Sequence, residues 1–149
     1  MNLDLSIVVP LYNEAESLPE LSDWIDKVIV SSNLKYELIF IDDGSKDNSW
    51  EVINNLQSKN KNIKGVSFRR NYGKSAALNI GFELSIGNVV ITMDADLQDD
   101  PHEITNLINK LEEGWDMVSG WKKNRNDPLE KKIPSKIFNK ITCFFTGVK

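Results

Sequence analysis

Short apolar runs alternate with amphipathic segments along this chain, and that alternation limits the possible folds more than any other feature. Strands are predicted at residues 5–9, 38–41, 63–68, 89–93 and 115–119, in runs too short for buried helices. Between them, apolar residues recur at every third or fourth position, as on the inner face of a helix. Strands that alternate with helices form βαβ units with right-handed crossovers. The sequence therefore predicts an α/β fold with an open, mainly parallel sheet and helices on both faces.

Capping residues and prolines predict where these elements begin and end. We expect Pro10 to end the first strand, and the first helix to begin near Glu14 and to bury Leu18, Leu21, Ile25 and Val28. A second helix is predicted after Asp47, which would cap it, and a third from Gly73, with Leu78 and Phe82 facing inward. A fourth is predicted with Asp100 as its N-cap, Pro101 in its first turn and Glu103 completing a capping box, and a last one from Pro134.

Two carboxylates follow the strand at 89–93, which is apolar enough to be buried on both faces. If the chain stays extended there, Asp94 and Asp96 point to the same side. Like charges this close repel, and a bound divalent cation such as Mg²⁺ or Mn²⁺ removes the repulsion. A metal–diphosphate site is one interpretation, and a solvated acidic loop is the other.

Polar side chains also follow the first two strands, and the carboxyl ends of parallel strands share one edge of a sheet. Tyr12 suits stacking on a base or half-buried packing. Asp42 and Asp43 suit either hydrogen bonds to a base and ribose or the turn chemistry of Asp-Gly-Ser. Lys74, at a helix start, suits a phosphate or an acid, or is one more exposed lysine.

Charge is distributed unevenly along the chain. The formal net charge of −4 does not favour nucleic acid as a partner. Residues 121–149 carry a net charge of +6 and residues 1–120 carry −10, which favours an anionic partner near the C-terminal part or a solvated basic face. The single Cys143 cannot form an internal disulfide, and no apolar run approaches membrane-spanning length.

Four motifs, in order, resemble family 2 glycosyltransferases with the Rossmann-like GT-A fold. They are residues 7–14 (IVVPLYNE), 41–47 (IDDGSKD), 70–74 (RNYGK) and 93–101 (MDADLQDDP). The sequence DADLQ, followed by residues 119–122 (SGWK) and by Asn124 and Arg125, is most similar to polyprenyl-phosphate glycosyltransferases. These include enzymes like dolichyl-phosphate mannose synthase and bactoprenol glucosyltransferase.

The resemblance implies a role for each matching residue. The nucleotide would contact residues of the first three motifs and the start of the fourth, namely Pro10, Tyr12, Glu14, Asp42, Asp43, Lys74, Asp94, Ala95 and Asp96. Asp96, helped by Gln98, would hold Mg²⁺ or Mn²⁺ against the diphosphate, and Asp94 and Asp96 would be the catalytic acids. Lys122 and Arg125 would face phosphate on the acceptor side, although lysine lacks the bidentate fork of arginine.

The resemblance further implies an inverting transferase that moves a sugar from a UDP- or GDP-sugar to a polyprenyl phosphate at the cytoplasmic face of the plasma membrane. Residues 1–120 would form the nucleotide-sugar-binding core, and residues 121–149 a basic loop and an amphipathic helix that start the acceptor side. We expect the chain to be an N-terminal piece of a longer enzyme, itself soluble, with an uncovered apolar helix face that favours homo-oligomers.

Three other functions are compatible with parts of the sequence. The acceptor of a related transferase would be a saccharide hydroxyl, in cell-surface polysaccharide synthesis. A non-catalytic nucleotide-binding module would use the same strand ends without transfer. A receiver-type signalling domain would need acids after the first strand and a phosphoacceptor after the third, where this chain has Pro10 and Arg69-Arg70, so the pattern argues against it.

Overall fold

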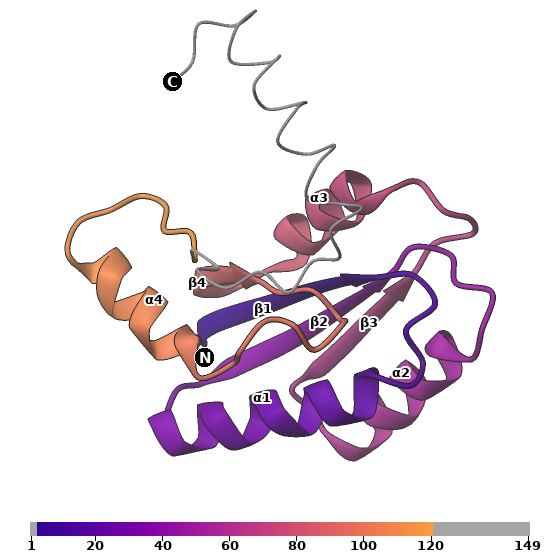
Figure 1. Cartoon of the computed structure of the whole chain (residues 1–149), viewed down its shortest axis with the longest axis horizontal. Coiled ribbons are helices and arrows are strands. Elements are labelled where there is room, and N and C mark those ends of the chain that lie inside the picture. Colours follow the sequence, from indigo (N-terminus) through magenta and orange to yellow (C-terminus); the bar gives the residue numbers. More distant parts are fainter. Residues whose placement is uncertain (1–2, 121–149) are drawn as a thin grey trace, which may run out of the picture. The chain divides into compact units, whose positions relative to one another are not determined.

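A parallel four-stranded sheet forms the centre of the computed structural model, which describes residues 3–120. Its strands are β1 (Leu3–Leu11), β2 (Tyr36–Asp42), β3 (Ile63–Ser67) and β4 (Gly87–Thr92), in the spatial order β3-β2-β1-β4. All three strand pairs are parallel, and the sheet twists across its width (Figure 1). The predicted open parallel sheet is confirmed.

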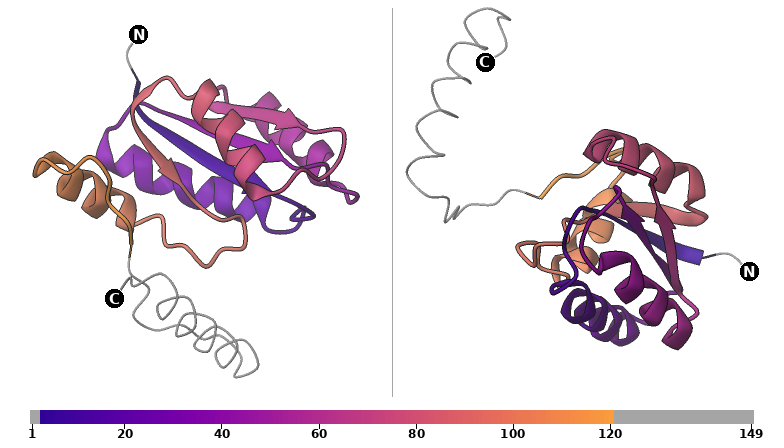
Figure 2. Two further views of the ribbon diagram at one scale, coloured as in Figure 1. Left: turned by 90° about the horizontal axis from the view of Figure 1, so that it is seen from above. Right: turned by 90° about the vertical axis from the view of Figure 1, so that its right-hand side faces the viewer.

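Helices cover both faces of this sheet (Figure 2). They are α1 (Leu18–Ser32), α2 (Ser49–Lys59), α3 (Lys74–Leu84) and α4 (Glu103–Glu112). Alternate residues of β1 point to opposite faces, so Ile7 and Val9 join the core that holds α1, α2 and Ile104 of α4. Val8 joins a smaller core with Ala77 of α3. The carboxyl ends of the strands are thereby left uncovered by helices and meet at one edge.

Pro10 lies inside β1 and pairs with Ile41, so the prediction that it ends the strand is wrong. The carbonyl of Leu11 accepts the N–H of Asp43 on the β2 side at 2.9 Å, and the backbone groups of successive residues face opposite neighbours. The nitrogen of Pro10 therefore faces the β4 side, where the last pairing is Val8 with Thr92. Its missing N–H removes no hydrogen bond from the sheet.

β4 is half exposed, which corrects the prediction of a strand buried on both faces. Within residues 3–120 it is an edge strand, and its burial alternates, with Val90 40% exposed. The prediction of a fifth strand at 115–119 is also wrong. These described residues form no strand, and Met117 is 84% exposed. Within residues 3–120, the edge of β4 away from β1 has no strand partner, and one of its two faces is exposed.

α3 contacts the sheet through small residues, which corrects the expected inward position of Phe82. Ala77 and Gly81 are its buried residues, Leu78 packs at the margin, and Phe82 is 50% exposed. A Cβ at Gly81 would collide with the side chain of Val8, so the helix backbone approaches β1 closely there. The residues of α3 that contact the sheet, Ala77 and Gly81, thus each lie one position before the large apolar residues that were predicted to do so.

Helix starts differ from the sequence prediction in three places. α1 begins at Leu18 rather than near Glu14 and buries the predicted face. α2 begins at Ser49, and Asp47 accepts the N–H of Ser49 at 3.0 Å although it lies one residue before the N-cap position. α4 begins at Glu103, and Asp100 caps a preceding turn instead of the helix, accepting the N–H of His102 at 2.9 Å. The predicted helix from Pro134 lies outside the described residues.

A buried carboxylate ties the strands together at the edge opposite their carboxyl ends. Glu37 of β2 is 2% exposed, and its Oε1 accepts the hydroxyl of Ser6 at 2.6 Å and the N–H of Ile86 at 2.8 Å. Its Oε2 lies 2.6 Å from Nζ of Lys64 on β3, and Ser6 Oγ accepts the N–H of Gly87 at 2.9 Å. Burial acts to raise the pKa of Glu37, but the hydrogen bonds from Lys64, Ser6 and Ile86 outweigh it and hold that pKa below its ordinary value.

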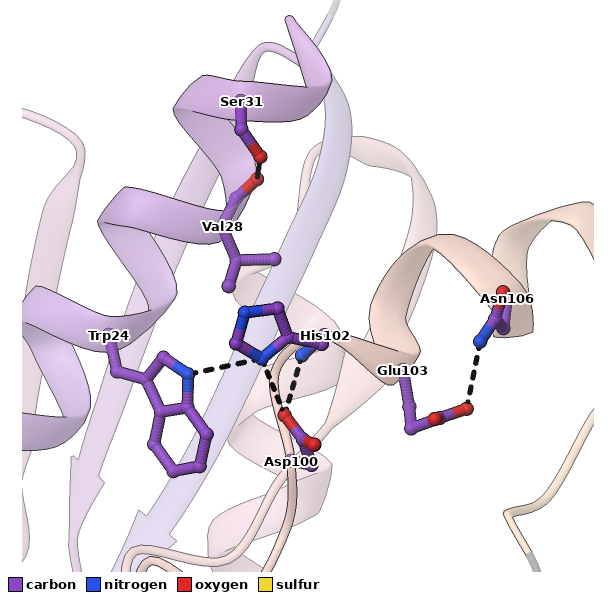
Figure 3. Close-up of polar contacts among 7 residues, drawn as sticks. All are labelled: Trp24, Val28, Ser31, Asp100, His102, Glu103 and Asn106. Carbon is purple, nitrogen blue, oxygen red and sulfur yellow. Dashed lines mark hydrogen bonds and ion pairs between the residues drawn. The ribbon is translucent and has the colours of Figure 1, made fainter.

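A polar contact joins α1 to the start of α4 (Figure 3). Nε1 of Trp24 lies 3.3 Å from Nδ1 of His102, and Oδ1 of Asp100 lies 2.8 Å from the same nitrogen. Nδ1 accepts from Trp24 when it is unprotonated and donates to Asp100 when it is protonated, so the two bonds exclude one another. The backbone N–H and ring of His102 hold the pKa of Asp100 below its usual range.

The chain divides into compact units at residues 1–118 and 119–149, and the first contains all the elements given above. None of the helices within residues 3–120 has the length and apolarity needed to span a bilayer.

Candidate nucleotide-binding site

One cavity of about 300 Å³ lies at the carboxyl edge of the sheet. It collects residues from the ends of β1, β2 and β4 and from the start of α3. Eight of its lining residues are predicted site residues, and four more complete the wall: Pro10, Tyr12, Glu14, Asp43, Lys74, Asp94, Ala95 and Asp96, with Leu11, Asn71, Gly73 and Ala77. The predicted convergence of separate strand ends is therefore present in the structure.

Two predicted site residues lie outside this cavity wall. Asp42 is 1% exposed, and its carboxylate accepts the N–H of Ser45 at 2.8 Å and the hydroxyl of Ser67 at 2.9 Å, so it serves the turn. Gln98 contacts Asp96 through its main chain, where its N–H donates to Asp96 Oδ1 at 3.1 Å. Lys122 and Arg125 lie outside the described residues.

The two acids after β4 have different electrostatic surroundings. Lys74 at the start of α3 forms an ion pair with Asp94, which balances the charge of that carboxylate inside the cavity wall. Asp96 is exposed, and within residues 3–120 no lysine or arginine pairs with it. The cavity thus presents one balanced acid and one acid whose charge is still available for a cation.

A divalent cation fits this arrangement of acids only if a ligand helps to bind it. In the described part of the chain no three His, Cys, Asp or Glu side chains gather into a metal-binding group. Mg²⁺ in phosphate-binding sites is commonly held by one or two carboxylates together with phosphate oxygens and water. Asp96, with its oxygens at the cavity wall, matches that pattern, in which a diphosphate supplies the remaining ligands.

Asp43 holds the loop that leads into α3. Its two oxygens accept the N–H groups of Tyr72 at 2.7 Å and Gly73 at 2.8 Å, and the side chain is 4% exposed. The adjoining Gly44 has a φ of +72°, and a Cβ there would lie 2.6 Å from Cα of Arg70, so only glycine allows this approach. Together, the Asp43 hydrogen bonds and the close approach at Gly44 place Lys74 at the cavity.

A second set of hydrogen bonds joins the β1–α1 loop to the β2–α2 loop. Asn13 donates its N–H to Ser45 Oγ at 2.8 Å, and its side-chain oxygen accepts the N–H of Lys46 at 2.8 Å. Ser49 accepts the N–H of Glu14 at 3.0 Å. These three hydrogen bonds, here called the loop clip, support Tyr12 and Glu14 at the cavity. The sequence did not predict the clip because its partners lie about 30 positions apart. The local signal in the sequence is the asparagine itself, a residue type that tolerates the positive φ that Asn13 adopts here.

Asp47 completes this clip. It accepts the N–H of Ala15 at 3.1 Å and the hydroxyl of Ser49 at 2.5 Å. Desolvation acts to raise the pKa of Asp47, and the hydrogen bonds from Ser49 and Ala15 outweigh it, so the pKa lies below its usual range. The loop connection is therefore strongest with Asp47 ionised.

Solved structures share this fold. A mannosyltransferase of Pyrobaculum calidifontis, in complex with GDP-Man and Mn²⁺, has a TM-score of 0.64 at 24% identity, over 74% of this chain and 33% of that one. A glucosyl-3-phosphoglycerate synthase of Mycobacterium tuberculosis, in complex with Mn²⁺, UDP and phosphoglyceric acid, has a TM-score of 0.59 at 25% identity, over 73% of this chain and 39% of that one. The first similarity concerns the fold alone.

A sequence relative extends over almost the whole chain. The undecaprenyl-phosphate 4-deoxy-4-formamido-L-arabinose transferase of Shewanella sediminis (strain HAW-EB3) is 43% identical over 150 residues, which are 99% of this chain and 45% of that protein. The chain thus spans less than half the length of this relative. The model of the family described as Glycosyl transferase family 2 matches residues 6–147. The chain therefore belongs to glycosyl transferase family 2, as its four motifs predicted.

Proposed function

We propose that this chain is the nucleotide-sugar-binding part of an inverting glycosyltransferase that transfers a sugar from a UDP- or GDP-sugar to a polyprenyl phosphate. The observation that carries the proposal is the single cavity into which Tyr12, Lys74, Asp94 and Asp96 converge from separate elements. The relative named for an undecaprenyl-phosphate substrate supports the acceptor class. The whole enzyme would work at the cytoplasmic face of the plasma membrane.

The residues around the cavity suit the parts of a nucleoside diphosphate. Tyr12, 38% exposed at the wall, offers a ring for stacking on the base. Glu14 offers carboxylate oxygens for base N–H groups and ribose hydroxyls, and Asp43 would support the same side of the nucleotide through the loop that its oxygens hold. Lys74 and Asp94 form the side that meets the ribose and the first phosphate.

Asp96, with Gln98 beside it, would hold Mg²⁺ or Mn²⁺ against the diphosphate. When bound, such a cation neutralises charge that develops on the leaving diphosphate. Asp96 contributes the protein's charge for that ion, while the Lys74–Asp94 pair keeps the second acid from repelling the phosphates.

Transfer to a phosphate needs little proton chemistry from this chain. The second pKa of a phosphate monoester is about 6, so the acceptor is largely ionised at neutral pH. An acceptor oxygen forms a bond to the anomeric carbon, the bond from that carbon to the diphosphate oxygen breaks, and the electron pair leaves with the nucleoside diphosphate. In-line attack inverts the anomeric centre. A saccharide hydroxyl would instead need a general base.

Nucleotide binding is expected to depend on a divalent metal. The full chain should bind UDP or GDP in calorimetry with Mn²⁺, and EDTA should weaken binding by roughly tenfold, or about 1.4 kcal/mol. Asp96→Asn should remove the difference between the metal and EDTA measurements while the thermal unfolding midpoint stays close to that of the parent, because Asp96 is exposed.

Glu112→Gln, an exposed acid on α4, is the matched control and should retain the full metal effect. Equal binding with Mn²⁺ and with EDTA would contradict the metal site. Binding of neither UDP nor GDP would contradict the proposed function as a whole.

Residues 122–136, which are rich in lysine and arginine, are expected to favour anionic membranes. Each lysine or arginine near such a surface contributes about 1 kcal/mol, an effect that salt screens. In vesicle co-sedimentation at low salt, the chain should prefer anionic to neutral vesicles. The double substitution of Lys122→Ala and Arg125→Ala should reduce that preference. Salt-insensitive binding to both vesicle types would leave the stretch a solvated face and favour a saccharide acceptor.

A further inference from the structure

We infer that Asp99 is a positioning residue that holds Asp94 at the cavity by closing the loop after β4. Asp99 Oδ2 accepts the backbone N–H of Asp94 at 2.9 Å. Asp99 does not line the cavity, so its effect on a ligand passes through Asp94. The inference rests on the proposed function, because it assigns a role within the same nucleotide site.

The sheet stops holding the chain just before the first acid. β4 ends at Thr92, and the N–H of Met93 makes the following bond to β1, to the carbonyl of Val8 at 3.1 Å. The next N–H along the chain, that of Asp94, faces away from β1, because successive N–H groups of an extended chain point to opposite sides, and its partner is the side chain of Asp99. Asp99 thus holds the main chain at the residue that follows the last hydrogen bond between β4 and β1.

The loop reverses direction so that Asp99 returns to Asp94. Leu97 adopts a φ of +61°, which is uncommon for a residue other than glycine, and its side chain packs against the main core. Asp96 Oδ1 accepts the N–H of Gln98 within this turn. Packing of Leu97 and the Asp99 bond therefore act together to fold the loop.

Anchoring on the core side leaves the acids on the cavity side. Met93 and Ala95, 5% and 4% exposed, belong to the main core, and the acids at 94 and 96 line the cavity wall together with Ala95. If the Asp99 bond is lost, the main chain of Asp94 has no partner from the sheet, and its carboxylate no longer keeps its place opposite Lys74. Removal of such supporting hydrogen bonds typically weakens binding by about 10- to 100-fold.

Hydrogen exchange of the Asp94 amide in the metal-free full chain tests the contact itself. Asp99→Ala should accelerate this exchange by roughly tenfold or more, because the amide loses its acceptor. Asp99→Asn retains a side-chain oxygen and should restore most of the protection. The matched control is Asp100→Ala, the neighbouring acid, whose carboxylate bonds to His102 and not to Asp94. Unchanged exchange in Asp99→Ala would overturn the inference.

Calorimetry with UDP and GDP in the presence of Mn²⁺ tests the consequence. Asp99→Ala should weaken the affinity about tenfold, with Asp99→Asn and Asp100→Ala close to the parent chain. In an Asp94→Asn background, Asp99→Ala should have little further effect, which a general loss of stability would not produce. Fully additive losses, or no loss in Asp99→Ala, would overturn the inference. Failure of the parent chain to bind either nucleotide would overturn the proposed function, while the exchange measurement would still decide whether Asp99 holds Asp94.

Discussion

Glu37→Ala should lower the free energy of unfolding by about 3 kcal/mol, within the range for breaking a buried ion pair. The substitution removes the acceptor of Ser6 and of the Ile86 N–H at a site that is 2% exposed. Lys64 is 49% exposed and regains water, so the loss stays at the lower end of that range. Urea denaturation at pH 7 measures the effect.

The stability that Glu37 contributes should also depend on pH. Its folded-state pKa lies below the ordinary value of 4.5, so the contribution is fully present above that value and is lost as the pH falls through the folded-state pKa. The gap in unfolding free energy between the parent chain and Glu37→Gln should therefore shrink on acidification below about pH 4.

Glu112→Ala, at an exposed position on α4, controls for the loss of an acid and should change stability by less than about 0.5 kcal/mol. A Glu37→Ala chain as stable as this control would show that the four strands do not depend on the buried carboxylate.

Gly44→Ala should disrupt the candidate site more than any single change of a cavity side chain. Alanine at a φ of +72° is strained, and its Cβ would collide with the backbone of Arg70 and lie 2.8 Å from the nitrogen of Asn71. Backbone atoms cannot rotate away, so the loop before Lys74 must move. Affinity for UDP or GDP with Mn²⁺ should fall by about 100-fold in calorimetry, because a shift of 1 Å commonly has an effect of this size.

Gly114→Ala is the matched control for backbone strain alone. Gly114 has a φ of +103°, and a Cβ there meets nothing within 4 Å. Its substitution should reduce stability by about 1 kcal/mol and leave nucleotide affinity unchanged. If Gly44→Ala resembles Gly114→Ala in both measurements, the close contact of Gly44 with the 70–71 backbone does not position the site.

Periodicity and strand topology were sufficient to predict the fold class and the edge of the sheet at which the site residues gather. Apolar periodicity distinguished strands from helices because side chains repeat every two residues in a strand and every 3.6 in a helix. Carboxyl ends of parallel strands share one edge, so Tyr12 and Asp94 are expected together, and both line the cavity. The sequence motifs also predicted membership of glycosyl transferase family 2, which the family match confirmed.

Tertiary contacts alone distinguish the acids that face the cavity from those that bind backbone N–H groups. Asp42 and Asp43 are neighbours of one type, yet the first caps a turn and the second holds the loop before α3 at the cavity wall. Asp94 and Asp96 share the cavity although the strand has ended, because Asp99 and Leu97 fold the loop. The roles of these acids depend on which residues the loops bring into contact. Loop conformation and packing decide those contacts, and neither periodicity nor motif spacing predicts them.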